Sequence, residues 1–211
     1  MVGTTKGKRL PVSYYQSLDV TTLAKDLLGK ILCTNIDGHY CSGKIIETEA
    51  YRGPDDRACH AYNDRRTPRT EVMFNKGGVA YIYICYGMHH LMNVVTGPRD
   101  HAHAILIRAL EPVNGIDVMA MRREMSTSDL RLTKGPGALS VAMGLHNSLT
   151  GSSLYSNSSP VWIEDRGLTL PSESICISKR IGVESAGEAA HWMWRFFEKG
   201  NRYVSAKRTC G

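Results

Sequence analysis

The sequence lacks the features that would place it in a specialised class of protein. No apolar run is long enough to cross a membrane, and the first residues, MVGTTKGKRLPVSYY, hold no apolar segment of signal-peptide length. None of the six cysteines forms a Cys-x-x-Cys pair, which argues against a zinc ribbon or a thioredoxin motif. We therefore expect a soluble intracellular protein with reduced thiols, cytoplasmic (nucleoid) if bacterial and nuclear if eukaryotic.

The composition indicates one globular domain with a modest basic excess. A chain of 211 residues can bury a core without metals or disulfides. Lys and Arg number 26 against 20 Asp and Glu, giving a formal charge of +6, which fits a polyanionic partner such as nucleic acid. No repeat or linker divides the chain, so we expect one domain over residues 1–211, with residues 1–12 as a flexible basic tail.

The strand and helix signals predict an α+β fold. Asp19 is a predicted N-cap for a first helix, and Asp37-Gly38 is a strong hairpin turn signal. Residues 52–78, rich in Gly, Pro, Asp and Arg, indicate a long ordered loop of the kind that is usually functional. The patterns predict helices at 20–28, 115–124 and 137–143, and strands at 31–36, 40–51, 79–86, 89–95, 104–110, 161–164, 175–178 and in the late segment YVS. Runs of strands with peripheral helices predict a single compact domain around a curved, mostly antiparallel sheet, with a protruding β-hairpin at 79–95.

One strand end carries a candidate catalytic carboxylate. The period of two places Glu47, Glu49 and Tyr51 on one strand face. A carboxylate beside a tyrosine can act as a general base next to a flat ligand, and the alternative is a solvated edge with two exposed glutamates. His60, in the loop that follows, is either a catalytic residue or a structural hydrogen-bonding group.

Tyrosines and arginines mark the same region as a candidate nucleic-acid site. Tyr81 and Tyr83 share one face of the strongest strand, whereas Tyr86 lies near the hairpin tip on the opposite face, where an exposed aromatic residue commonly acts as a wedge. The alternative for the strand tyrosines is a role in the core. A basic loop beside aromatics is typical of phosphate contacts next to a base-stacking pocket, although a solvated basic loop has the same composition; its basic residues are Arg65, Arg66, Arg69 and Lys76.

These pieces together match a known family. The sequence resembles the alkyladenine (3-methyladenine) DNA glycosylases from about residue 13 to residue 205. The likeness is carried by IIETEAYRGPDD, ACHAYNDRRTPRTEVMF, AYIYICYGMHHLMNVV, ILIRALEP, KRIGVESAGEAA and WRFF.

The resemblance implies an active site. Glu49 would be the general base that activates water, and Arg108 would help to hold that water. Tyr51, His60 and Tyr83 would line a pocket for a flipped base, with the two tyrosines as stacking faces.

It also implies how the protein would engage DNA. Asn93 would lie at the pocket floor, where it crowds the 2-amino group of a normal guanine. Tyr86 would be the wedge that fills the gap in the duplex, and Arg65 and Thr67 would contact backbone phosphates. A backbone carbonyl near Glu198 would help to position the water.

The implied reaction is base excision without a metal or cofactor. The protein, as a monomer on double-stranded DNA, would flip out alkylated or deaminated purines of the 3-methyladenine, 7-methylguanine, hypoxanthine and ethenoadenine type. It would hydrolyse the N-glycosidic bond and leave an abasic site. Neutral lesions need a proton on the leaving purine, for which His60 and ordered water are both candidates. His89 and His90 follow the hairpin tip where other members carry aromatics, so contacts of the tip with DNA can differ.

Three alternatives remain at the level of sequence. A binding module without activity would keep the basic loop and the aromatics but would not need Glu49 with Arg108. A glycosylase that also nicks the strand would use an amine such as Lys44 or Lys134. A metal hydrolase would draw its ligands from Asp55, Asp56, His60, His101 and His103, although no zinc-site signature supports it.

Overall fold

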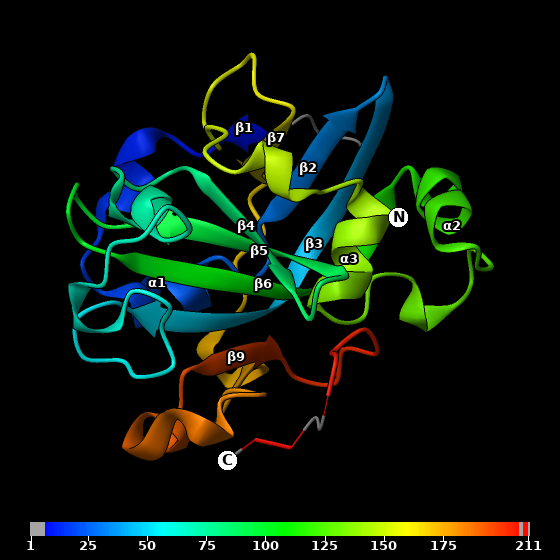
Figure 1. Ribbon diagram of the computed structural model, residues 1–211. Coiled ribbons are helices and arrows are strands. Elements are labelled where there is room, and N and C mark those ends of the chain that lie inside the picture. Colours follow the sequence, from blue (N-terminus) through cyan, green and yellow to red (C-terminus); the bar gives the residue numbers. More distant parts are fainter. Residues whose placement is uncertain (1–6, 207–208, 211) are drawn as a thin grey trace.

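Two long strands, β3 (His39–Arg52) and β6 (His103–Asn114), pair in antiparallel fashion at the centre of a curved sheet (Figure 1). The structure is a computed structural model that describes residues 7–206 and 209–210. The sheet runs in the order β1-β7-β2-β3-β6-β5-β4, and every pairing in the described part of the chain is antiparallel. The predicted α+β class is confirmed. The other strands are β1 (Lys8–Arg9), β2 (Ile31–Ile36), β4 (Ala80–Cys85), β5 (His89–Thr96), β7 (Val161–Asp165), β8 (Ile175–Ser178) and β9 (Arg195–Glu198).

Three α-helices and several short 3-10 turns surround this sheet in the described residues. Helix α1 (Val20–Asp26) begins after Asp19, whose carboxylate accepts the backbone N–H groups of Thr21 and Thr22, as the N-cap prediction requires. Helices α2 (Ile116–Arg123) and α3 (Pro136–Met143) follow β6, close to their predicted positions. The 3-10 turns are η1 (Val12–Gln16), η2 (Tyr62–Asp64), η3 (Glu71–Phe74), η4 (Leu130–Leu132), η5 (Asn147–Leu149), η6 (Ser172–Ser174) and η7 (Glu184–His191).

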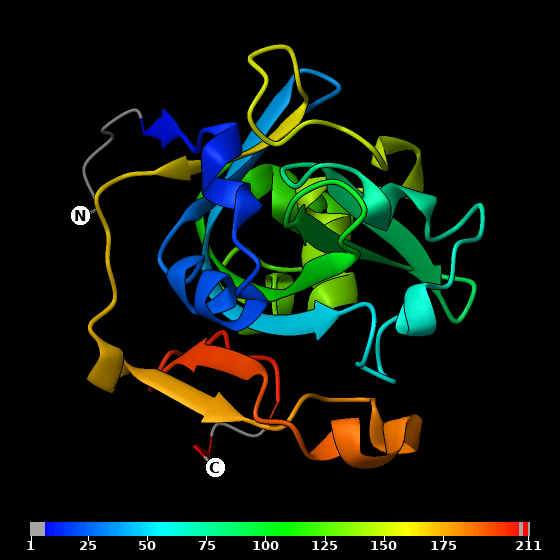
Figure 2. The same ribbon diagram turned by 90° about the vertical axis from the view of Figure 1, so that its left-hand side faces the viewer.

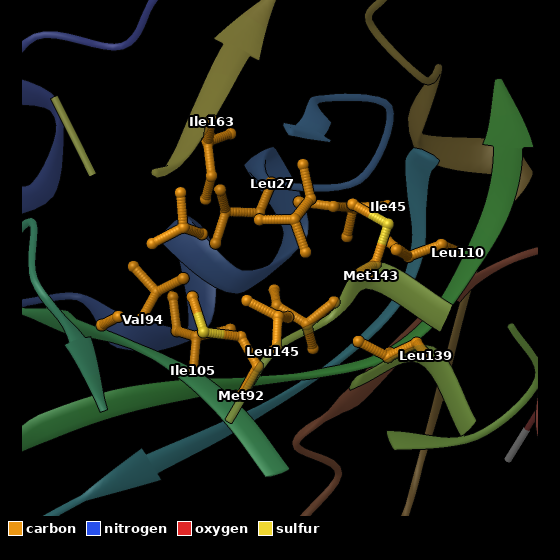
Figure 3. Packing of buried hydrophobic residues seen from close by; sticks show 14 of the residues in the cluster. Leu27, Ile45, Met92, Val94, Ile105, Leu110, Leu139, Met143, Leu145 and Ile163 are labelled. Carbon is orange, nitrogen blue, oxygen red and sulfur yellow. The ribbon is translucent and has the colours of Figure 1, made fainter. Parts of the chain in front are cut away.

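The alternation of side chains divides the sheet into two faces with different roles. Met92 and Val94 of β5 and Ile105 and Ile107 of β6, each two residues apart, enter the main core. Figure 3 shows side chains of both strands packed with residues of α3 and with Leu27, which follows α1. The opposite face of β4, β5 and β6 supports a second, smaller cluster beneath the loop that follows β3; its buried members are Cys59, Ala61, Met73, Phe74, Tyr81, Val95, Ala102 and Ala104.

Irregular pairing makes β3 the hub of the sheet. Its first half pairs with β2 through the turn at Asp37-Gly38, where both residues have positive φ, as predicted for this dipeptide. Its register with β6 shifts on both sides of Glu47, which is the mark of a β-bulge. The segment Glu47–Glu49 also pairs with β9, which lies with β8 along one side of the molecule (Figure 2).

Three predictions about the ends of the chain and the cysteines are wrong. Residues 1–6 of the predicted tail lie outside the described residues, but Lys8–Arg9 pairs with β7 and Leu10 is buried, so the fold begins before residue 12. No strand forms at YVS, because residues 202–203 are a turn. Cys176 and Cys210 form a disulfide and are not reduced thiols, because the chain end returns to β8. Within the described part of the chain, no helix is both long and apolar enough to span a bilayer.

Candidate active site

A cavity of about 460 Å³ opens on the sheet face opposite the main core. Residues of β3, β4, β5 and β6 form one side, the loop between β3 and β4 forms another, and Ile181–Val183 closes a third. Its volume is in the range of small-molecule pockets. Of the predicted site residues, Tyr51, His60, Tyr83, Tyr86, Asn93 and Arg108 line it.

Glu49 lies fully buried directly behind the cavity wall. One carboxylate oxygen accepts the Tyr51 hydroxyl at 2.8 Å and also lies 3.1 Å from Nη1 of Arg108. The other oxygen accepts the backbone N–H of Ile181 at 2.8 Å. The solvated-edge alternative for this strand end is wrong, because Glu47 and Glu49 have no exposed surface. A carboxylate held by two hydrogen-bond donors and one ion pair next to a cavity is suited to orient water or to stabilise a nearby positive charge.

A second buried glutamate fixes Arg108 from the other side. Nε of Arg108 donates to Glu47 at 3.1 Å, so the guanidinium bridges Glu47 and Glu49. Arg195 also donates to Glu47, and Ser205 donates through both its backbone N–H and its hydroxyl. Burial alone would raise the pKa of Glu47, but the charges of Arg108 and Arg195 outweigh burial, and the pKa is lowered. Arg108 is thus locked in place at the cavity wall.

Tyr51 is backed by a buried ion pair. The guanidinium of Arg180 lies 4.7 Å from the centre of the Tyr51 ring, and it donates to both carboxylate oxygens of Asp56 and to the carbonyl of Ala50. Both charged side chains of this pair are fully buried. Burial, followed by the charge of Glu49, raises the pKa of Tyr51 well above its ordinary value, so the hydroxyl stays protonated and donates to Glu49. The ring is therefore a rigid wall.

Another part of the cavity lining is an aromatic cluster of Tyr81 and Tyr83 from β4 and His60 from the preceding loop. The His60 ring meets Tyr83 edge to face at 4.6 Å, and Tyr81 lies 5.5 Å from Tyr83 on the same strand face, as predicted. His60 Nδ1 lies 2.8 Å from the Tyr81 hydroxyl, and His60 Nε2 lies 3.3 Å from Nη2 of Arg69. Because Arg69 can only donate, Nε2 is the acceptor and Nδ1 carries the proton. Burial, then the charge of Arg69, lowers the pKa of His60 to about 4, which argues against His60 as a proton donor at neutral pH.

Asn93 lies in β5 with its amide pointing back to the strands. Its nitrogen donates to the carbonyls of Tyr81 and Leu91 at 3.1 and 3.3 Å, so its orientation is fixed. It is buried and lines the cavity beside the aromatic wall.

Tyr86 stands at the tip of the predicted hairpin between β4 and β5. It is 90% exposed, the highest value among the large hydrophobic residues described, and Met88 in the same turn is also exposed. Its φ is +50°, which is rare for a bulky side chain, and Gly87 follows at +72°. Tyr86 lies in the turn and not in β4, so the alternation of strand faces does not determine where its side chain points. It lines the same cavity as Tyr83.

Arg65 and Thr67 lie on the loop outside the cavity lining. Arg65 is exposed, and its carbonyl accepts the Thr70 hydroxyl at 2.8 Å. Thr67 is half-buried, and its hydroxyl lies 3.1 Å from that of Thr70. These bonds hold the loop in one shape and leave the Arg65 guanidinium at the surface.

One predicted position is wrong, and a neighbouring one was missed. Glu198 ends β9 opposite Ile175, where its carboxylate pairs with Lys44, and it does not line the cavity. The register explains this, because β9 meets Glu49 at Arg195, three residues earlier. The residue beside Glu49 is Ile181, whose backbone N–H donates to the carboxylate. The sequence gives no signal for this contact, because the backbone makes it and the side chain is apolar. The sequence gives no signal for Arg180, whose guanidinium reaches the Tyr51 ring and Asp56.

The geometry disfavours the metal and Schiff-base alternatives. His101 and His103 contact each other edge to face, but no cluster of three or more His, Cys, Asp or Glu suited to a metal occurs among the described residues. Lys44 pairs with Glu111 and Glu198; burial lowers its pKa, yet these partners outweigh burial and raise it. Neither Lys44 nor Lys134 lines the cavity.

Comparisons with known proteins identify the family of this chain. The family model for methylpurine-DNA glycosylase (MPG) matches residues 13–202. A relative from Chlamydia abortus is 47% identical over 188 residues, which cover 89% of this chain and 96% of its own length. Relatives from Bacillus cereus and Clostridium perfringens are 43% and 41% identical, covering 93% and 94% of this chain and 98% and 100% of their own. All three carry names that assign them provisionally as 3-methyladenine DNA glycosylases. The chain therefore belongs to the methylpurine-DNA glycosylase family.

Proposed function

We propose that this protein flips alkylated or deaminated purines out of double-stranded DNA and hydrolyses their N-glycosidic bond, leaving an abasic site. Family membership makes it a DNA glycosylase for alkylated purines. The observation that carries the finer proposal is the buried Glu49–Arg108 pair directly behind a cavity walled by Tyr51 and Tyr83. A binding module has no need for a carboxylate in that position.

The proposed chemistry uses the Glu49 carboxylate twice. As the bond between C1′ and the purine nitrogen breaks, its electron pair leaves with the purine and the sugar becomes positively charged, which a nearby carboxylate stabilises. Water then adds to C1′ and gives a proton to Glu49. Arg108, held by Glu47, keeps the carboxylate in place and balances its charge before the reaction.

The remaining site residues have roles in binding. Tyr51 and Tyr83 would stack on the extruded purine, and Asn93 would crowd the 2-amino group of a normal guanine. Tyr86 would fill the space that the purine leaves in the duplex, where extrusion costs a few kcal/mol. Arg65 and Thr67, on the ordered loop, would contact phosphates and fix the register of the duplex. The proposed enzyme acts as a monomer, without a cofactor.

The test is incubation with matched duplex oligonucleotides that carry 3-methyladenine, 7-methylguanine, hypoxanthine or ethenoadenine at one position. We expect release of the free base and strand breaks only after alkaline treatment. An undamaged duplex is the control. Binding without release would favour a binding module, and a covalent adduct trapped by borohydride would favour an amine nucleophile.

A further inference from the structure

Arg69 differs from the other arginines at the site in having no carboxylate partner among the described residues. Arg108 bridges two glutamates, and Arg180 is paired with Asp56. Arg69 lines the cavity, is exposed, and makes its contacts with aromatic rings: its guanidinium lies 4.9 Å from the centre of the Tyr83 ring, and Nη2 reaches His60 Nε2. One positive charge at the cavity is therefore not compensated by a neighbouring acid.

This charge occupies a position that matters for base recognition. A tyrosine face attracts a cation placed over it, so the Tyr83 face alone would favour a positively charged purine. In this protein the Arg69 guanidinium already lies over the Tyr83 ring. A purine that entered beside it would meet a guanidinium, and charges separated by a few ångströms interact appreciably even at a protein surface.

The two chemical classes of lesion respond differently to a guanidinium. Purines methylated at N3 or N7, such as 3-methyladenine and 7-methylguanine, are cations in the nucleotide and are repelled by it. A deaminated adenine is neutral, and its carbonyl oxygen and ring nitrogens can accept hydrogen bonds from the same group.

We propose that Arg69 is a specificity-determining residue that shifts the balance of excision away from cationic alkylated purines and toward neutral purine lesions with hydrogen-bond acceptors. This inference rests on the proposed function and concerns the substrate class of the same site. Arg69 acts by its charge next to Tyr83, and it takes no part in breaking the bond.

The test compares single-turnover release of 7-methylguanine and of hypoxanthine from otherwise identical duplexes, with the free base measured by chromatography. For Arg69→Gln we expect the ratio of 7-methylguanine to hypoxanthine release to rise about tenfold over the wild type. Arg69→Lys keeps the charge and should stay close to the wild-type ratio. Arg57→Gln is the matched control, because it removes an exposed charge from the same loop without touching the cavity lining.

The failures of the two proposals are distinguishable. A wild-type protein that releases neither base overturns the proposed function. A wild-type protein that is active, with a ratio unchanged in Arg69→Gln, overturns the role of Arg69 alone. An equal loss on both lesions, together with weaker binding to undamaged DNA, would make Arg69 a phosphate contact and would also overturn the inference. Thermal melting of each variant checks that the fold is retained.

Discussion

At the scale of single residues, the site is organised by buried charges that are matched to one another. Glu49 has no exposed surface, and an isolated carboxylate in that position would be costly. It is retained because Arg108 forms an ion pair with it, and the Tyr51 hydroxyl and the Ile181 N–H group donate hydrogen bonds to it. The Glu49 carboxylate is therefore preorganised for the reaction, because its orientation does not have to change when the reaction begins.

Glu49→Gln should strongly slow excision while the protein still binds lesion-containing DNA. The amide keeps the shape but loses the charge and the basicity, so we expect the single-turnover rate to fall roughly 100-fold to 10,000-fold. Arg108 keeps its bond to Glu47, so thermal melting should show a folded protein. Excision within about tenfold of the wild type, a barrier change of only ~1.4 kcal/mol, would remove Glu49 from the role of base.

His60 should stay neutral throughout the physiological pH range. Burial, and then the charge of Arg69, lowers its pKa to about 4, whereas an unfolded histidine has a pKa of about 6.5. Between these two values the unfolded chain binds more protons, so the contribution of His60 to stability is complete above about pH 6.5 and is lost as the pH falls toward 4.

The measurement is an NMR titration of the His60 ring, combined with urea unfolding at pH 5 and pH 7. In His60→Gln the difference in unfolding free energy between the two pH values should be smaller than in the wild type. A titration midpoint near 6.5 would contradict the burial argument and would restore His60 as a candidate acid for neutral lesions.

At the scale of elements, the hairpin β4–β5 carries residues with separate tasks. Its strand tyrosines face the cavity, and its turn presents Tyr86 with a positive φ at almost full exposure. A bulky residue held in that conformation at a surface tip is costly, and such outliers cluster at functional sites. This supports a role for the tip in contact with the duplex.

Tyr86→Ala should impair extrusion more than bond cleavage. We expect a large fall in single-turnover excision from a fully paired duplex, and a much smaller fall when the lesion lies opposite a mismatch or in a bulge. The difference should follow the flipping cost that the weakened substrate no longer requires, which is a few kcal/mol at most. Tyr86→Phe, which keeps the ring, is the control. Equal losses on both substrates would show that Tyr86 belongs to the pocket.

Local turns, helix caps and strand faces were the parts of the fold most accessible to prediction. Alternation in β3 placed Glu49 and Tyr51 together, because the register shifts precede Thr48 and leave the period of two intact beyond it. The cap of α1 at Asp19 and the turn at Asp37-Gly38 depend on residues that are adjacent in the sequence, so the residue types alone predict them.

Contacts that depend on long-range approach were not predictable in this way. Ile181 reaches Glu49 through its backbone, and Cys176 meets Cys210 only because the chain end returns to β8. The absence of Glu198 from the cavity follows from the register of β9 on β3, for which no sequence pattern exists.

At the scale of the whole molecule, the excess of positive charge favours binding to a polyanion such as DNA. The net charge is +6, and the buried arginines around Glu49 are neutralised by acids, so the excess lies elsewhere, with Arg65 among its exposed members. Charges of this kind bind the phosphate backbone by releasing condensed counterions, independently of the base in the pocket.

Affinity for undamaged duplex should therefore fall steeply as salt rises, and each phosphate contact should contribute to the slope. We expect Arg65→Ala to lower the slope of log affinity against log salt by about one, without changing the ratio of release between two lesions. Arg131→Ala is the control, because Arg131 is ion-paired with Asp129 and lies outside the loop and the cavity. Fluorescence anisotropy over a range of KCl concentrations gives both slopes. If the slope of Arg65→Ala equals that of the wild type, Arg65 makes no phosphate contact, because a charge that touches DNA must release counterions whatever the base.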